Sequence, residues 1–242
     1  MTFFKYNGRS SAEFGLRIEK KDVFSAPEYD MDFESIPGRS GDLIISNNRF
    51  KNIRVSYTVF LVRKDIDTLA DTLRAIKGWL YTEPDRYHEI TDSYDTGYIR
   101  YGVIYEGLDI EEQLNKVGCF RVTFSCKPFR YQEVGFEEIA VASGESLFNP
   151  EAFASAPIIT LTGSGDMSLT LQNASYNKTW HFKDIPTAIT CDSEQMNFYH
   201  GTTLLNGSVV GEDFPKLPPG ETTITCTGDV ESLVVKPRWC AL

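Results

Sequence analysis

The sequence predicts a mainly β protein, in which an α+β first domain with one helix precedes a second domain that is a β-sandwich. Three observations predict this fold class: apolar and polar residues alternate in several segments, one segment has helical periodicity, and the second half carries short strands separated by turns with Gly or Pro. The 242 residues and 41% hydrophobic content suffice for the cores of two ordinary domains.

The composition changes at about residue 134, where charge falls and Thr and Ser become more frequent. Residues 1–133 hold 19 Lys and Arg against 21 Asp and Glu, whereas residues 134–242 hold 5 against 13. We therefore predict two domains, 1–133 and 134–242, with the boundary between about 133 and 147. The acidic second half disfavours nucleic-acid binding, because phosphates attract clusters of Lys and Arg.

Two strands are predicted on either side of the turn-rich stretch SIPGRSGD, residues 35–42. The downstream strand is Ile53–Val62, which alternates apolar and polar residues and then becomes apolar on both faces. The upstream strand would place its acidic side chains on one face and its apolar ones on the other. The acids are Glu28, Asp30, Asp32 and Glu34, and the apolar residues are Tyr29, Met31 and Phe33.

The turn residues of SIPGRSGD predict a hairpin tip. Pro37 and Gly38 suit the two central positions of a type II turn, because proline fixes the first φ and glycine accepts the positive second φ. Arg39 would then be exposed at the tip, and Gly41 would relax the return of the chain.

One helix is predicted at Asp65–Leu80, where apolar residues recur at steps of three and four behind acidic residues. The other predicted strands are 89–95, 98–105 and 120–126 in the first domain and Ile158–Thr162, Met167–Leu171 and Glu221–Cys226 in the second. On the strand 120–126, alternation puts Cys126 on the apolar face and points Cys119 the other way.

The sequence lacks the signals of export and of a membrane span. No apolar run approaches the roughly 18 residues that a span requires, and the first residues lack the pattern of a signal peptide. The five cysteines form no CxxC pair, so we expect free thiols that act as small buried hydrophobes in a chain made in the cytoplasm.

No cofactor or metal is expected. Gly163-Ser164-Gly165 lacks a third glycine and a following helix, and residues 36–42 lack the GK[ST] ending of a phosphate-binding loop. In the run 92–97, Tyr94 and Thr96 occupy places where a calcium loop requires Asp or Asn. The three histidines, His88, His181 and His200, have no local ligand partners.

An enzyme is not expected either, because no catalytic motif is present. Carboxylates on the strand 28–34 are spaced as a glycosidase pair could be, but one polar strand face explains them better. No Gly-x-Ser-x-Gly elbow exists, and no cysteine begins a helix beside a histidine.

Several motifs in one order resemble the distal tail (Dit) proteins of long-tailed, siphovirus-type bacteriophages and prophages. The resemblance covers essentially all of residues 1–133 and continues less strongly into the second half. It rests on FFKYNG at 3–8, FGL at 14–16, SIPGRSGDL at 35–43, IKGWL at 76–80, ITDSYD at 90–95, YIR at 98–100 and FSCKPFRY at 124–131. In the second half it rests on FNP at 148–150, PII at 157–159 and FPKLPPGE at 214–221.

The resemblance implies a structural hub of the tail tip, or baseplate, that is not an enzyme. It implies a sandwich-like first domain with a long hairpin arm, a galectin-like sandwich as second domain, and a hexameric ring. The ring would join the tail tube protein to the tail tip proteins and anchor the receptor-binding proteins of host adsorption, in a virion assembled in the bacterial cytoplasm. DNA would pass through without specific binding, and no membrane would be contacted.

In that picture the hairpin arm within residues 28–57 would embrace the neighbouring subunit, because a long exposed hairpin is an edge liability unless something covers it. The candidate ring-interface residues are Glu28, Asp30, Asp32, Glu34, Pro37, Gly38 and Arg39. The acids would meet basic residues of the next subunit and Arg39 would make a charge-assisted contact. A solvated turn is the alternative interpretation.

The alternative function is a carbohydrate-binding module that contacts the host cell surface. Sugar sites combine stacking aromatic rings with hydrogen-bonding side chains, and the second domain offers Trp180 and Tyr199. Trp180 is explained better as a core residue. The roughly 109 residues that follow the boundary leave no room for an inserted lectin domain of the kind that some relatives carry.

Overall fold

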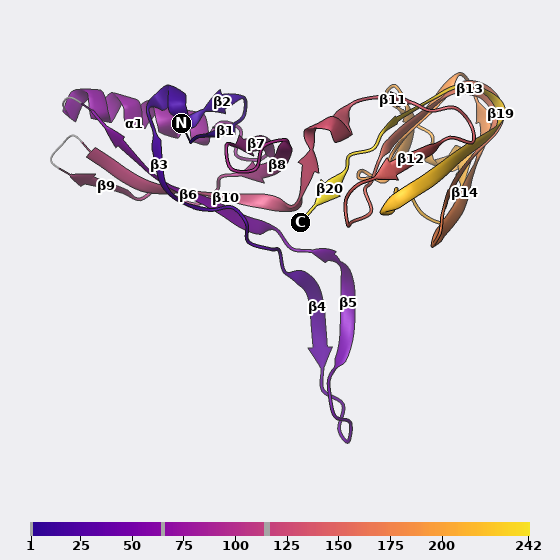
Figure 1. The fold of residues 1–242 in the computed structure, drawn as a ribbon, viewed down its shortest axis with the longest axis horizontal. Helices are drawn as coiled ribbons and strands as arrows, with labels where there is room; N and C mark the ends of the chain where they lie inside the picture. Colours follow the sequence, from indigo (N-terminus) through magenta and orange to yellow (C-terminus); the bar gives the residue numbers. More distant parts are fainter. Residues whose placement is uncertain (1, 64–65, 114–116) are drawn as a thin grey trace. The chain divides into compact units, whose positions relative to one another are not determined.

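The computed structural model describes residues 2–63, 66–113 and 117–242. The chain divides into two compact units, residues 1–130 together with Leu242 and residues 131–241 (Figure 1). Both units consist mainly of antiparallel strands, which confirms the predicted mainly β fold. Among the described residues, no helix combines the length and apolar character needed to cross a bilayer.

The first unit is built on a sheet with the strand order β2-β1-β7-β8-β10-β6-β3, and β9 pairs with β10. The strands are β1 (Phe4–Tyr6), β2 (Arg9–Ser10), β3 (Arg17–Asp22), β6 (Ile53–Val62), β7 (His88–Asp92), β8 (Tyr98–Val103), β9 (Ile110–Gln113) and β10 (Val117–Gln132). A 3-10 helix, Ser11–Phe14, lies between β2 and β3.

The sheet curls so that its first strands cover its last ones. Three strands separate β1 from β6 in the sheet order, which is about 19 Å in a flat sheet. The rings of Phe4 on β1 and Tyr57 on β6 nevertheless stack with centroids 4.5 Å apart, and Phe4 also stacks on Trp79 at 5.7 Å. The core of the unit therefore lies inside the curled sheet.

The helix α1 (Ile66–Leu80) contributes to this core. Leu69, Ile76 and Leu80 are completely buried, as the spacing of apolar residues predicts. The predicted first residue, Asp65, lies outside the described residues.

A separate two-stranded sheet, β4 (Tyr29–Glu34) with β5 (Leu43–Phe50), forms the hairpin. The upstream strand was expected to pair with Ile53–Val62, and this was wrong. That segment is β6, which pairs with β10 and β3 because its apolar side chains require burial in the core. Leu43–Phe50 (LIISNNRF) has no period-two pattern, so hydrophobic periodicity does not predict this strand.

The hairpin tip has the predicted conformation. The backbone N–H of Arg39 donates to the carbonyl of Ile36 at 3.1 Å, and Gly38 has a φ of +82°. Proline at the first central position and a positive φ at the second define a type II turn.

The second unit is a sheet that folds over on its two longest strands, β13 (Ile158–Asn173) and β19 (Gly220–Lys236). Buried side chains from both ends of β13, such as Leu161 and Leu171, belong to one core. The other strands of this sheet are β11 (Ile139–Ala140), β12 (Ser146–Asn149), β14 (Tyr176–Ile185), β15 (Ala188–Asp192), β16 (Asn197–His200), β17 (Thr203–Leu204) and β18 (Val209–Val210), with 3-10 helices at Glu133–Phe136 and Asn206–Ser208. The short strand β20 (Cys240–Ala241) pairs with β10 and is not part of this sheet.

The predicted strands Ile158–Thr162 and Met167–Leu171 are one strand that passes through a bulge. The pairing of β13 with β19 shifts between Thr162 and Met167. A Cβ on Gly163 would lie 2.1 Å from the carbonyl oxygen of Asp229, so only glycine allows this approach. Gly163 and Gly165, which predict a turn here, lie in the bulge instead.

All five cysteines are free, as predicted. Cys126 and Cys191 are buried, and burial raises the pKa of each thiol to about 12. Cys119 and Cys226 are half-buried.

Candidate functional site

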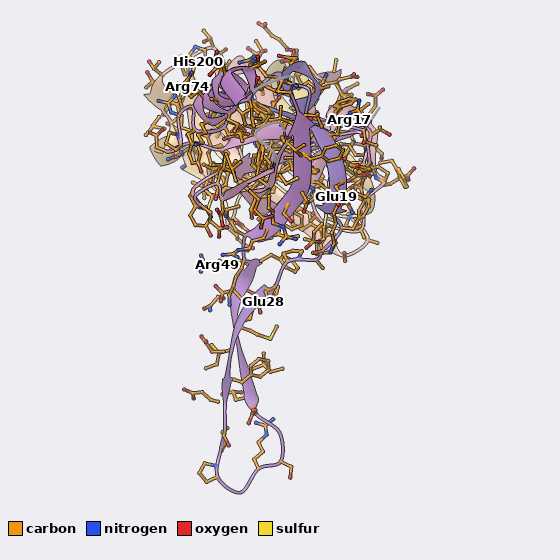
Figure 2. The ribbon with its side chains drawn as sticks, turned by 90° about the vertical axis from the view of Figure 1, so that its left-hand side faces the viewer. Arg17, Glu19, Glu28, Arg49, Arg74 and His200 are labelled. Atoms are coloured by element: carbon orange, nitrogen blue, oxygen red, sulfur yellow. The ribbon has the colours of Figure 1, made fainter. Side chains whose placement is uncertain are left out.

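The hairpin is the most exposed part of the first unit, and we call residues 28–50 the arm. Every residue from Asp32 to Arg49 is exposed. Figure 2 shows its side chains pointing to solvent on both sides, away from the rest of the unit. A two-stranded sheet without a covering layer is marginally stable in water, and a partner surface would supply the missing layer.

The strand register defines the two faces of the arm, because directly opposite residues share a face. Phe33 lies opposite Ile44, and these two side chains are 61% and 60% exposed. On the other face, Asp32 lies opposite Ile45 and Glu34 opposite Leu43. Asp32 and Glu34 therefore share one face of β4 as predicted, and β5 adds the apolar side chains of Ile45 and Leu43 beside them.

The base of the arm is braced by ion pairs within the chain. Arg49 Nε donates to Asp30 Oδ2 at 2.6 Å, and Lys51 Nζ donates to Glu28 Oε2 at 3.2 Å. The hydrogen bond from Arg49 is the largest cause that lowers the pKa of Asp30 below its ordinary value. Two of the four predicted interface acids are thus already compensated by their own chain.

Aromatic rings anchor the same end of the arm to the first unit. Tyr29 packs edge-on against Phe50 with centroids 4.9 Å apart, and Phe50 packs against Phe129 of β10 at 5.7 Å. The other predicted interface residues, Asp32, Glu34, Pro37, Gly38 and Arg39, lie beyond this anchor. Within the described part of the chain, the side chains of Asp32, Glu34 and Arg39 have no hydrogen-bond or ion-pair partner.

The arm combines exposed apolar side chains, uncompensated charges and unpaired strand edges, which is chemistry for binding another protein chain. Over residues 2–63, 66–113 and 117–242, no group of three His, Cys, Asp or Glu side chains could hold a metal ion. The site therefore has the character of an interface.

The residues considered for metal binding have structural contacts. Asp92 Oδ1 accepts hydrogen bonds from the backbone N–H groups of Tyr94 and Asp95, and its Oδ2 accepts one from the hydroxyl of Tyr57 at 2.6 Å. His88 bonds the carbonyl of Glu83. The run 92–97 is a turn fixed by its first aspartate.

The two candidate sugar contacts do not meet in one hollow. Trp180 is 1% exposed and its indole N–H donates to the carbonyl of Asp213. Tyr199 is half-buried and lines a different hollow, beside Lys236 and Glu138. Trp180 is a core residue, which is the interpretation that its sequence context favours.

Comparison with known proteins extends this description. Residues 12–126 match the family model of the phage tail protein RIFT-related domain. The crystal structure of SPP1 Dit (gp 19.1), described as a paradigm of hub adsorption apparatus in phages that infect Gram-positive bacteria, is similar with a TM-score of 0.74, at 15% identity over 97% of both chains. The family resemblance that the sequence predicts is thereby confirmed.

A second structure is more distant. The activated baseplate of phage P2 contains a chain that is similar with a TM-score of 0.50, at 7% identity over 97% of this chain and 96% of that one. A search of curated protein sequences found no match.

Proposed function

We propose that the chain, whose residues 12–126 match the family model of the phage tail protein RIFT-related domain, is a structural hub of the phage tail tip. In this proposal it has no catalytic activity. Six copies form a ring that joins the tail tube to the tail tip and anchors the proteins of host adsorption. The fold it shares with SPP1 Dit over 97% of both chains supports this function.

The observation that carries the proposal is the exposed arm. Its apolar residues Phe33, Ile44 and Ile45 are at least 42% exposed although they lie on regular paired strands. An isolated copy leaves these side chains in water, at a cost that burial against a neighbour would remove. The arm therefore serves as the contact with the next subunit.

A ring is the closed form of such a contact. In this proposal the arm of one copy packs on a different part of the next copy, so the interface is heterologous, and it generates a ring when the rotation closes. The number of copies, six, comes from the family resemblance. DNA passes through such a ring without specific binding, since the chain has a net charge of −10 and repels phosphates.

The mass of the purified chain by light scattering tests the ring, together with negative-stain images of the same peak. Six copies of 27.3 kDa give about 164 kDa and a particle with a central hole. A mass of 27.3 kDa at every concentration and also in the presence of tail tube protein would contradict the proposal.

Paired variants test the role of the arm. We expect the double variant Phe33→Ser, Ile44→Ser to be monomeric under conditions in which the unmodified chain forms rings. The control Phe148→Ser, Leu204→Ser removes two side chains of similar exposure, 63% and 64%, from the second unit and should leave the rings intact. Rings that survive the arm variant would overturn the assignment of this face.

A further inference from the structure

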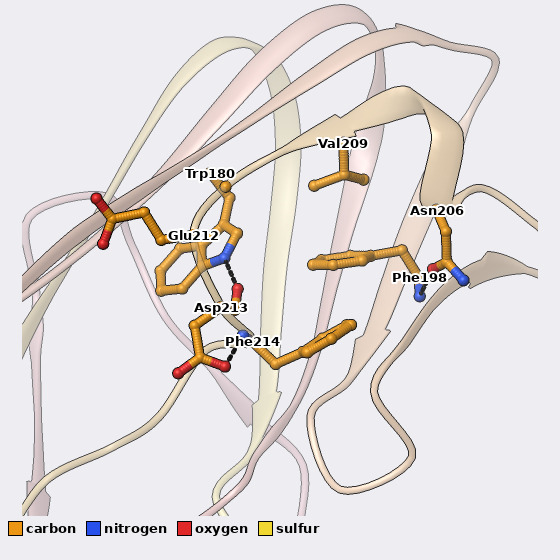
Figure 3. Close-up of a pocket in the computed structure, with 8 residues that line it drawn as sticks. Trp180, Phe198, Asn206, Val209, Glu212, Asp213 and Phe214 are labelled. Carbon is orange, nitrogen blue, oxygen red and sulfur yellow. Dashed lines mark hydrogen bonds between the residues drawn. The ribbon is translucent and has the colours of Figure 1, made fainter.

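The second unit contains a pocket of about 190 Å³ with aromatic walls (Figure 3). Trp180 and Phe198 at its base are buried, and Val209 and Phe214 are half-buried. Polar residues at its mouth are exposed: Asn206, Glu212 and Asp213. The pocket thus runs from a polar, solvent-exposed rim to an apolar floor.

The walls are held in place by specific packing. The rings of Phe198 and Phe214 stack with centroids 5.1 Å apart. Gly211 lies directly against the indole, because a Cβ there would be 2.2 Å from Trp180 Cδ1. The indole N–H of Trp180 donates to the carbonyl of Asp213, which fixes the loop that carries Phe214. A pocket held in this way is preformed, which lowers the entropic cost of binding.

Polar side-chain atoms of the rim already have partners. Asp213 Oδ1 accepts the backbone N–H of Phe214 at 2.8 Å, and Asn206 Oδ1 accepts that of Phe198 at 2.6 Å (Figure 3). The indole N–H is likewise in use. A sugar requires several hydrogen bonds directed at its hydroxyls, whereas an apolar group requires none. The pocket therefore matches an apolar ligand better than a sugar.

The volume of the pocket limits the size of the apolar ligand group. An apolar cavity of about 150 Å³ holds one benzene molecule, so about 190 Å³ accommodates one aromatic ring or one branched aliphatic side chain.

The net charge of the second unit indicates which residues flank the apolar group of the ligand. Residues 134–242 hold 5 Lys and Arg against 13 Asp and Glu. At the pocket mouth, Lys216 and Lys178 pair with Asp213 and Glu212 at 3.3 and 3.6 Å, so the mouth itself is close to neutral and the negative charge belongs to the unit as a whole. An acidic unit attracts basic segments.

We propose that this pocket is a docking socket for a partner protein, which inserts one aromatic side chain flanked by Lys or Arg. Such an anchor in a preformed pocket is the usual form of a binding hot spot. This proposal does not depend on the proposed ring, because the pocket lies wholly within the second unit.

Fluorine NMR of the full chain labelled with 5-fluorotryptophan tests the socket. The chain has three tryptophans, Trp79, Trp180 and Trp239, and the variant Trp180→Phe assigns the signal of the pocket. The probe is a blocked peptide with a central phenylalanine between lysine pairs, and its alanine counterpart is the reference. We expect the phenylalanine peptide to shift the Trp180 signal alone and to bind about tenfold or more tightly than the reference.

Two adjacent valines provide matched variants. Val209 lines the pocket, whereas Val210 is 56% exposed and lines a separate hollow. Val209→Phe should fill the pocket and abolish the shift, and Val210→Phe should leave it unchanged.

Three results would overturn the socket. The phenylalanine and alanine peptides could bind equally, which would mean that charge alone attracts them. Val209→Phe could bind like the unmodified chain. Finally, galactose or glucose could shift the Trp180 signal in the unmodified chain and not in Val209→Phe, which would make the pocket a sugar site. The pocket lies wholly within the second unit, so the peptide result does not depend on the number of copies, and failure of the ring proposal would be recognised separately.

Discussion

The arm and the pair β6–β10 are both antiparallel strand pairs of the first unit, and they differ in what covers them. In β6–β10, Val55, Tyr57 and Phe124 are completely buried. On the arm, Phe33 and Ile44 are about 60% exposed. Phe33 and Tyr57 both alternate with polar neighbours in the sequence, so alternation fixes the extended backbone in both regions and fixes burial in neither.

Burial of the apolar side chains on a strand therefore depends on what packs against the strand as well as on the strand's own residues. Tyr57 is covered by Phe4 because the sheet curls over it. Within the described residues of the first unit the arm has no second layer, and in the proposed ring a neighbouring copy would supply one. Mutations in the two regions should therefore affect different properties: folding stability in β6–β10, and association in the arm.

The largest expected contrast is between two phenylalanines. Phe124→Ala should lower the free energy of unfolding of the first unit by about 3–5 kcal/mol, because it leaves a cavity in the core. Phe33→Ala should change it by less than about 0.5 kcal/mol in the monomer. Urea unfolding followed by circular dichroism measures the free energy of unfolding of both variants. Equal losses of stability would contradict the distinction between the buried strand pair and the arm.

A second contrast compares two tyrosine hydroxyls. Tyr57 donates to Asp92 at 2.6 Å inside the unit, whereas the hydroxyl of Tyr29 contacts Ser46 at 2.9 Å on the exposed arm. Tyr57→Phe should cost about 1.5–3 kcal/mol, because it removes the hydrogen bond that the buried ring donates to the charged, half-buried Asp92. Tyr29→Phe should cost about 0.5 kcal/mol or less. The same unfolding measurement decides, and a costly Tyr29→Phe would mean that the arm contributes to folding.

A third change acts on the arm alone. Gly38→Ala places a side chain at a φ of +82°, which should cost about 1 kcal/mol in the turn. Gly107→Ala, where φ is not in that range and the space is open, is the control. We expect faster amide hydrogen exchange in residues 29–50 of Gly38→Ala, with unchanged global unfolding. A lowered global stability of Gly38→Ala would contradict an arm that opens independently of the core.

The smallest expected effect concerns the ion pair at the base of the arm. The pKa of Asp30 lies below its ordinary value of 3.8 because Arg49 donates to it. Since the folded-state pKa is the lower one, the contribution of the pair is present above pH 3.8 and is lost as the pH falls through the folded pKa. Carboxylate NMR titration should show this pKa rising toward 3.8 in Arg49→Gln. An unchanged titration would exclude Arg49 as the cause.

Sequence periodicity predicted the elements that bury an apolar stripe in their own chain. The helix 66–80 and the strand Ile53–Val62 lie where expected because core contacts reward their periodicity. The type II turn followed from Pro37 and Gly38, whose φ preferences are local.

Elements that lack a periodic pattern, and contacts between residues far apart in the sequence, were not predictable in the same way. Leu43–Phe50 pairs with β4 although its residues do not alternate. The stretch around Gly163 is a bulge because the backbone of Asp229 approaches it, and no local signal reveals that neighbour. The aromatic pocket likewise joins residues from 180 to 214 that only the folded sheet brings together. The internal pairing of Asp30 with Arg49 also lay outside what the acidic pattern alone could indicate.

Amide hydrogen exchange across the arm tests the central claim most directly. The exchange of residues 29–50 would be compared between assembled unmodified chain and the monomeric variant Phe33→Ser, Ile44→Ser, with Trp180 and its strand as internal reference. We expect strong protection of the arm in the assembled state and fast exchange in the monomer, while the reference strand is equally protected in both. Arm amides that exchange equally fast in assembled particles would show that no neighbour covers the arm.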